Sequence, residues 1–119
     1  MKNILVVEDE DKIRNIYIKL LTDEGYSVFE SSNVSDAYEI ATDNNIDLII
    51  LDIRMPEIEG NILYEILQFM RIKSKILIAS VYPIETQRIM IPDAADYFDK
   101  SYNLDILLEK VNNILSDKQ

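Results

Sequence analysis

Carboxylates stand directly after two of the most apolar runs in this 119-residue chain. Asp52 follows the run at residues 48–51, and Glu8 and Asp9 follow the run at residues 4–7. Runs this apolar are typical of strands buried on both faces, and parallel strands bring their carboxyl ends to one edge of a sheet. At ~5 Å and an effective dielectric constant of ~20, each ionised pair there costs on the order of 3 kcal/mol. Such a cluster indicates a site for a divalent cation, with Mg²⁺ or Mn²⁺ preferred by oxygen ligands.

Strands and helices alternate along the chain, which is the pattern of a doubly wound α/β sheet with helices on both faces. Apolar runs predict five strands, over residues 3–7, 27–30, 47–51, 75–79 and 95–98. Apolar residues at helical spacing predict helices that contain residues 13–21, 34–41, 62–70 and 104–115. A further helix of about two turns is expected at 84–91, between two prolines.

Individual residues mark the ends and faces of these helices. Asn33 and Asn103 are expected to be N-caps, and Gly25 is expected to end the first helix. The apolar stripe of the third helix is expected to consist of Ile62, Leu63, Ile66, Leu67 and Met70.

The composition excludes several classes of protein. A length of 119 residues suits one domain, in which residues 117–119 are expected to be a frayed tail. The absence of cysteine excludes disulfides and fits a cytoplasmic protein. No apolar run approaches the ~20 residues of a membrane span. A formal net charge of −10 argues against direct contact with nucleic acid, because phosphate binding requires a surplus of lysine and arginine.

Polar residues stand after four of the five predicted strands. They are Glu8-Asp9 after the first, Asp52-Ile53-Arg54-Met55-Pro56 with Gly60 after the third, Ser80 after the fourth and Lys100 after the fifth. In this order they resemble the receiver domain of bacterial two-component response regulators, of the chemotaxis response regulator type, over essentially the whole chain. The resemblance implies a flavodoxin-like fold with a five-stranded parallel sheet of order 2-1-3-4-5.

The resemblance also implies a phosphorylation site with a metal ion. Asp52 is expected to be the phosphoacceptor, which forms an acyl phosphate by in-line attack. Asp9 and Asp52 are expected to bind Mg²⁺ directly, and Glu8 directly or through water. The main-chain carbonyl oxygen of Arg54 is the remaining expected ligand, and Mn²⁺ is an alternative ion.

A conformational switch is expected to follow phosphorylation. Ser80 would donate a hydrogen bond to a phosphoryl oxygen and draw its loop inward, while Lys100 supplies a charge to the same group. Tyr97, three residues before Lys100, occupies the aromatic switch position of the family and would fill the space that opens. The face formed by the helix at 84–91, the strand at 95–98 and the last helix is expected to bind a downstream protein or a second copy.

Each of these side chains could instead serve the fold alone. The alternatives are a turn-forming acid at Asp52, acids in the first turn of a helix at Glu8 and Asp9, a hydroxyl that closes a strand at Ser80, a surface lysine at Lys100 and a half-exposed tyrosine at Tyr97.

Three residues depart from the family pattern. Ser101 stands where the family usually has proline after the lysine. A cis bond before a non-proline residue costs ~2.5–4 kcal/mol, so a trans bond between Lys100 and Ser101 is expected. Asp93 replaces a glycine, and Val81 replaces alanine or glycine, where its bulk would narrow the entrance to Asp52.

The leading hypothesis is a signalling module that catalyses only its own phosphotransfer and dephosphorylation. Its phosphoryl group would come from a histidine kinase or phosphotransfer protein, because the chain itself contains no histidine. One alternative is a pseudo-receiver, an interaction module that is not phosphorylated. A doubly wound flavin binder or phosphatase is disfavoured: the acids at residues 8–11 would repel a flavin phosphate, and Arg54 stands where a phosphatase would have its second acid.

Overall fold

A computed structural model describes residues 1–55 and 59–116, so Pro56 and the expected tail at 117–119 lie outside the described residues. Its centre is a five-stranded sheet in which every neighbouring pair of strands is parallel. The strands are β1 (Asn3–Val7), β2 (Ser27–Ser31), β3 (Leu48–Leu51), β4 (Lys75–Ser80) and β5 (Asp96–Asp99). Their order across the sheet is β2-β1-β3-β4-β5, which confirms the predicted flavodoxin-like topology.

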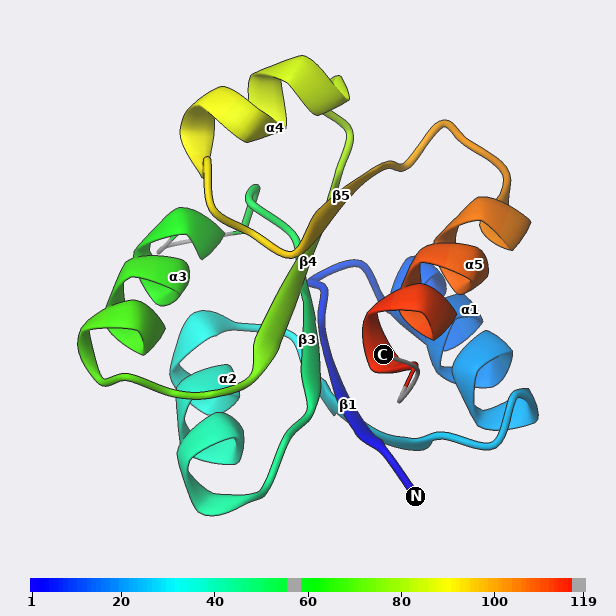
Figure 1. The fold of residues 1–119 in the computed structure, drawn as a ribbon, viewed down its shortest axis with the longest axis horizontal. Coiled ribbons are helices and arrows are strands. Elements are labelled where there is room, and N and C mark those ends of the chain that lie inside the picture. The colour runs from blue at the N-terminus through cyan, green and yellow to red at the C-terminus, as the bar shows by residue number, and fades with distance from the viewer. Residues whose placement is uncertain (56–58, 117–119) are drawn as a thin grey trace.

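Helices cover both faces of this sheet. Within the described part of the chain they are α1 (Asp11–Asp23), α2 (Val34–Asp43), α3 (Gly60–Phe69), α4 (Ile84–Met90) and α5 (Leu104–Leu115). Figure 1 shows α1 and α5 on one side of the strands and α2 and α3 on the other, and the core contacts place α4 with α2 and α3. The arrangement is therefore doubly wound, as expected. None of these helices combines the length and the apolar character that a membrane span requires.

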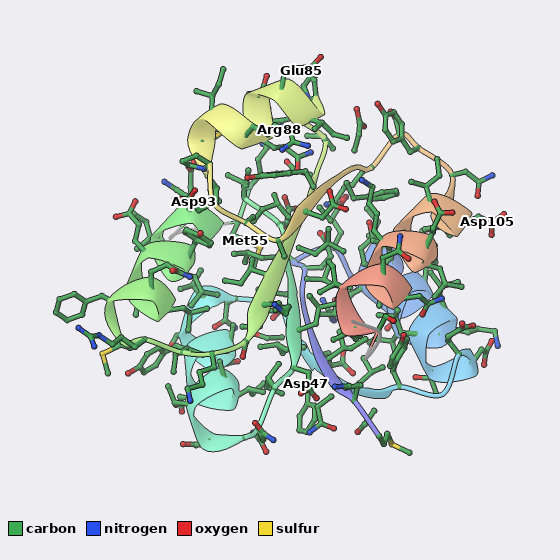
Figure 2. All side chains as sticks on the ribbon, viewed as in Figure 1. Asp47, Met55, Glu85, Arg88, Asp93 and Asp105 are labelled. Atoms are coloured by element: carbon green, nitrogen blue, oxygen red, sulfur yellow. The ribbon has the colours of Figure 1, made fainter. Side chains whose placement is uncertain are left out.

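The central strand β3 is uniformly apolar because both of its faces are covered. In β3, Ile49 and Leu51 pack in the layer with α2 and α3, whereas Leu48 and Ile50 pack in the layer with α1 and α5. All four are at most 1% exposed. Figure 2 shows side chains filling the space on both sides of the sheet. Polar residues are therefore concentrated beyond the strand ends, where the sheet meets solvent.

The predicted helix caps are confirmed. The Asn33 side chain accepts a hydrogen bond from the backbone nitrogen of Asp36, and the Asn103 side chain accepts one from that of Asp105. Gly25 follows α1 with a φ of +102°, a conformation that favours glycine.

The predicted stripe of α3 is wrong in part. Leu63 and Leu67 are at most 1% exposed, but Ile62, Ile66 and Met70 are 37% to 49% exposed. A helix that covers a sheet buries only the residues along its line of contact, and the residue before each buried leucine lies on the flank of that line. The short helix expected between Pro83 and Pro92 is present as α4, which has seven residues.

Candidate functional site

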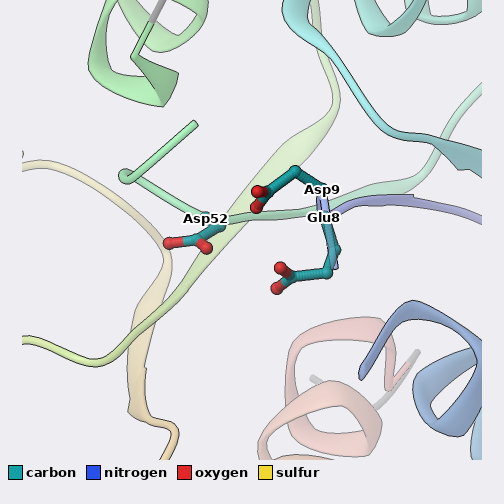
Figure 3. A group of neighbouring side chains, drawn as sticks. All are labelled: Glu8, Asp9 and Asp52. Atoms are coloured by element: carbon teal, nitrogen blue, oxygen red, sulfur yellow. The ribbon is translucent and has the colours of Figure 1, made fainter. Parts of the chain in front are cut away.

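Glu8, Asp9 and Asp52 lie together at the carboxyl edge of the sheet (Figure 3). β1 and β3 are neighbours with Val7 opposite Leu51, so the residues that follow these strands emerge side by side. One carboxylate oxygen from each of the three acids lies within 4.8 Å of the others. Glu8 and Asp52 are only 2% and 5% exposed. The structure thus brings Asp52 together with two adjacent acids that lie far from it in the chain.

Lys100 reaches this cluster from the end of β5. Its Nζ lies 2.6 Å from Glu8 Oε1 and 2.8 Å from Asp52 Oδ2, and its side chain is 9% exposed. Its backbone nitrogen donates to the carbonyl oxygen of Ser80, which holds the ends of β4 and β5 together. Lys100 is a buried charge between two carboxylates, so the alternative of an ordinary surface lysine is wrong.

The loop that carries Lys100 is held without proline. The peptide bond between Lys100 and Ser101 is trans, as expected. Ser101 donates from its backbone nitrogen and from its hydroxyl to Asp99 Oδ1, at 2.9 and 2.7 Å. The backbone nitrogen of Tyr102 donates to the Asp99 carbonyl oxygen. These bonds form an Asx-type turn that restricts the loop.

Burial dominates the electrostatics of the two inner acids. It raises the pKa of Glu8 and the pKa of Asp52 above their ordinary values, although the hydrogen bonds and charge of Lys100 act in the opposite direction. Burial acts to lower the pKa of Lys100, but its hydrogen bonds to Asp52 and Glu8 raise that pKa on balance. Lys100 therefore stays protonated beside two acids. One lysine does not balance the charge of the cluster, which favours the binding of an additional cation.

The donor set fits a hard divalent cation. Mg²⁺ binds oxygen at 2.0–2.1 Å, so two of its ligands lie at most about 4.2 Å apart. One carboxylate oxygen from each of Glu8, Asp9 and Asp52 lies within 4.8 Å of the others, which is close to that spacing. Asp9 and Asp52 also line a cavity of about 590 Å³, which has room for the water ligands that Mg²⁺ retains. The main-chain oxygen of Arg54 stays a predicted ligand.

Ser80 ends β4 beside this cavity. It is fully buried, and its Oγ accepts a hydrogen bond from the backbone nitrogen of Tyr82 at 3.3 Å. No acceptor for its hydroxyl proton occurs among the described residues, so that proton is available to a ligand. Val81 is 56% exposed and lines the cavity, which remains open despite the bulk of this residue.

The chain after Asp52 is held close to the end of β3. The backbone nitrogen of Arg54 donates to Asp52 Oδ1 at 3.1 Å, and the Arg54 guanidinium lies 5.9 Å from the ring centroid of Tyr82. Gly60 packs directly on the backbone, because a Cβ at this position would lie 2.0 Å from the Asp52 carbonyl oxygen. Glycine is therefore required here by the close approach of two backbone segments.

Tyr97 belongs to the core layer of α2 and α3, not to the carboxylate cluster. It is 2% exposed, so the alternative of a half-exposed tyrosine is wrong. Its hydroxyl donates to the Ile91 carbonyl oxygen at 2.5 Å and accepts from the backbone nitrogen of Ala94 at 3.3 Å. The Arg88 guanidinium lies 4.6 Å from its ring centroid, on the side of α4 that faces β5 (Figure 2).

Sequence reasoning missed Gln87, which is fully buried on α4 between Tyr82 and β5. A signal was available, because Ile84, Gln87 and Ile91 stand at i, i+3 and i+7 and therefore share one face of the helix. It also missed the stacking of Arg54 on Tyr82, for which spacing carries no signal.

Comparisons with known proteins agree with this geometry. The response regulator receiver domain model matches residues 4–112. A probable transcriptional regulatory protein of Picosynechococcus sp. is 34% identical over 98% of this chain. The match covers 50% of that relative, so the chain spans about half its length.

Solved structures of the response regulator protein TrrA from Thermotoga maritima are also similar. Its complex with Mg²⁺–BeF has a TM-score of 0.88 and 36% identity, over 97% of this chain and 100% of that one. TrrA in complex with the histidine kinase ThkA has the same TM-score and identity, over 98% of this chain and 100% of that one. With a family model that matches residues 4–112 and a relative that is 34% identical over 98% of the chain, the chain belongs to the response regulator receiver domains of two-component systems.

Proposed function

We propose that Asp52 accepts a phosphoryl group from a phosphohistidine of a histidine kinase or a phosphotransfer protein. The observation that carries this proposal is the position of its carboxylate, which lines a cavity of about 590 Å³ and lies 2.8 Å from Lys100 Nζ. The chain has no histidine, so the phosphohistidine belongs to the partner. The complex of TrrA with the histidine kinase ThkA supports a partner of this class.

Asp52 acts as the nucleophile. A carboxylate oxygen attacks phosphorus in line, and a P–O bond forms while the P–N bond to the partner's imidazole breaks and its electron pair leaves with the ring. Glu8, Asp9, Asp52 and the main-chain oxygen of Arg54 hold Mg²⁺, and Mn²⁺ is an alternative on ligand chemistry alone. When bound, the ion neutralises charge on the phosphoryl oxygens. The complex of TrrA with Mg²⁺–BeF supports the choice of metal.

Ser80 and Lys100 bind the transferred group. The Ser80 hydroxyl donates a hydrogen bond to one phosphoryl oxygen. Lys100 gives up one of its two carboxylate partners and binds another phosphoryl oxygen in its place. The response then passes through Tyr97 to the face formed by α4, β5 and α5. This face is a suitable contact for a downstream protein or a second copy, because Ile89 and Tyr102 are 82% and 46% exposed on it.

The domain, residues 1–119, acts in the cytoplasm and touches neither membrane nor nucleic acid directly. Its surplus of acids supports protein partners, since phosphate backbones repel a chain with a net charge of −10. Any effect on transcription, which the name of the Picosynechococcus relative suggests for that protein, runs through a partner or an attached domain.

Loss of the phosphoryl group is catalysed slowly by the domain itself. Arg54 lines the cavity and rests on the Tyr82 ring, where it restricts the approach of water to the acyl phosphate. Arg54→Ala should shorten the lifetime of the phosphorylated protein, measured by the decay of the intact-protein adduct in mass spectrometry. An unchanged lifetime contradicts the shielding by Arg54.

The decisive experiment is intact-protein and peptide mass spectrometry after incubation with a small acyl phosphate and Mg²⁺. One phosphoryl adduct on Asp52 is expected, and none on the Asp52→Asn variant or after removal of Mg²⁺ by a chelator. The absence of an adduct, with folded protein and a receiver of known activity labelled in parallel, supports the pseudo-receiver alternative instead.

A further inference from the structure

Gln87 is a buried amide in the middle of the short helix α4. It is fully buried, and its Nε2 donates two hydrogen bonds, to the Tyr82 carbonyl oxygen at 2.8 Å and to the Phe98 carbonyl oxygen at 3.0 Å. An amide nitrogen has two protons in one plane, so both donors are used and the directions of both bonds are set by the same rigid group. The two backbone carbonyls are therefore held at one relative position.

These two carbonyls belong to the segments that carry the phosphoryl-binding residues. Tyr82 lies two residues after Ser80, and its backbone nitrogen already donates to Ser80 Oγ. Phe98 lies two residues before Lys100 and directly after Tyr97. The side chain of Gln87, which belongs to α4, thus links the loop after β4 to the end of β5.

Packing does not explain an amide at this position. The Oε1 atom of Gln87 is buried and has no hydrogen-bond donor among the described residues. A buried carbonyl without a donor is unfavourable, and an unbranched apolar side chain of similar size would fill the space without that penalty. What an apolar side chain cannot do is donate to Tyr82 and Phe98, so the two donated bonds are the property that distinguishes glutamine here.

We propose that Gln87 is the positioning residue that couples the Ser80 loop to β5. This inference rests on the proposed function, in which Ser80 moves toward the phosphoryl oxygens. When Ser80 moves, the Tyr82 carbonyl moves with it. Gln87 then carries α4 and the Phe98 carbonyl along, because separating either pair would leave a further polar group unbonded inside the protein. The displacement reaches Tyr97 from both sides, through Phe98 and through the Ile91 carbonyl at the end of α4.

The test compares Gln87→Met with Gln68→Met, which makes the same chemical change at an exposed position of α3. Backbone amide shifts are recorded for ¹⁵N-labelled full-length protein as Mg²⁺ and beryllofluoride are added to saturation. Shifts at Asp9 and Asp52 report occupancy of the site, and shifts at Ile89 and Tyr97 report transmission. The ratio of distal to local shifts at equal occupancy is the readout, since a loss of packing alone does not change it selectively.

Gln87→Met is expected to keep the local shifts and to lower the distal-to-local ratio by about threefold or more, whereas Gln68→Met keeps the wild-type ratio. A wild-type ratio in folded Gln87→Met overturns the coupling role of Gln87. If Gln87→Met does not fold, Gln87→Leu is measured in the same way with the same two outcomes. Failure of the proposed function looks different, because wild-type protein would then show no shifts at Asp9 and Asp52, and both proposals would fall.

Discussion

Two regions of this domain bury polar groups near strand ends. In the first, the charged region, the charge of buried acids is partly balanced by a buried lysine. In the second, the neutral region, uncharged polar groups are satisfied by hydrogen bonds. The carboxylate site buries Glu8 and Asp52 around the ammonium group of Lys100. The region around Gln87 and Tyr97 buries an amide and a phenol, both bonded to backbone carbonyls. The energy of the first region depends on charge, and therefore on pH and cations, whereas that of the second depends on geometry alone. The domain thus keeps its ligand-responsive part apart from the part that transmits shape.

The largest effect on stability is expected from removing the ammonium group of Lys100 from the charged region. Lys100→Met leaves Glu8 and Asp52 buried without a counter charge, which should lower the free energy of unfolding by about 3 kcal/mol in the absence of divalent cations. Urea denaturation measures this loss. Mg²⁺ should restore part of it, because the ion binds the native state. Lys12→Met, at an exposed lysine, is the control and should change stability by no more than about 0.5 kcal/mol. Equal losses in the two variants contradict the buried ion cluster.

Removing one acid should have a smaller effect of opposite sign. Burial raises the pKa of Asp52 above its ordinary value of 3.8, so its contribution to stability is fully present below that value and is lost as pH rises through the raised pKa. At pH 7 the metal-free Asp52→Asn variant should therefore be more stable than wild type. Urea denaturation at a series of pH values should show this difference shrinking as pH falls toward 4.

Mg²⁺ binding provides a second comparison of wild type with Asp52→Asn. At matched ionic strength, millimolar Mg²⁺ should raise the melting temperature of wild type more than that of Asp52→Asn, because the variant lacks one ligand. An Asp52→Asn variant that is less stable than wild type at pH 7 without Mg²⁺ would show that Lys100 overcompensates the acids.

The contribution of the neutral region to stability should change on mutation but should not depend on pH or Mg²⁺. Tyr97→Phe removes the hydroxyl that donates to the Ile91 carbonyl oxygen, which should cost about 1 kcal/mol of stability. The loss should be the same at pH 5.5 and pH 8, and with or without Mg²⁺, in parallel urea titrations. Tyr102→Phe, at a residue that is 46% exposed, is the matched control with little expected change. A loss that varied with Mg²⁺ alone, without a phosphoryl group or its mimic, would contradict this difference between the two regions.

The smallest effect is expected at the edge of the neutral region. Arg88 is exposed, and its guanidinium stacks on the Tyr97 ring at 4.6 Å from the centroid. A double-mutant cycle of Arg88→Gln with Tyr97→Leu should give a coupling energy of about 0.5 kcal/mol, as for cation–π pairs whose cation is exposed to solvent. A coupling energy of zero would show that Arg88 does not interact with Tyr97 and does not contribute to the neutral region.

The sequence predicted the charged region much better than the neutral one. Asp52 and Glu8 follow strands whose apolar runs are unmistakable, so the ends of those strands place the acids without knowledge of any contact. Lys100 could be placed in the same way. Gln87 acts through backbone carbonyls of Tyr82 and Phe98, and the partners of such a bond are decided by how α4 packs, which local spacing does not encode.

Exposure within helices shows the same limit. The periodicity of α3 identified Leu63 and Leu67 correctly as core residues. It could not tell that Ile62 and Ile66 would lie at the flank, because that depends on the line along which the helix meets the sheet. The trans bond before Ser101 was predictable from local energetics, whereas the Asx-type turn with Asp99 that holds it became visible only in the structure.

The ion pair between Lys100 and Glu8 closes a loop of 92 residues. Contacts this distant in the sequence form late in folding, since the chain entropy lost in closing the loop must be offset by strands that have already paired. During synthesis, a chain that has emerged only as far as β4 has both inner acids but not their lysine, and burying those acids is then unfavourable. A domain made from its N-terminus onward therefore assembles its reactive centre last. If Asp52 accepts a phosphoryl group as proposed, a chain whose fifth strand has not yet docked would be unable to take it up, because its site is not yet formed.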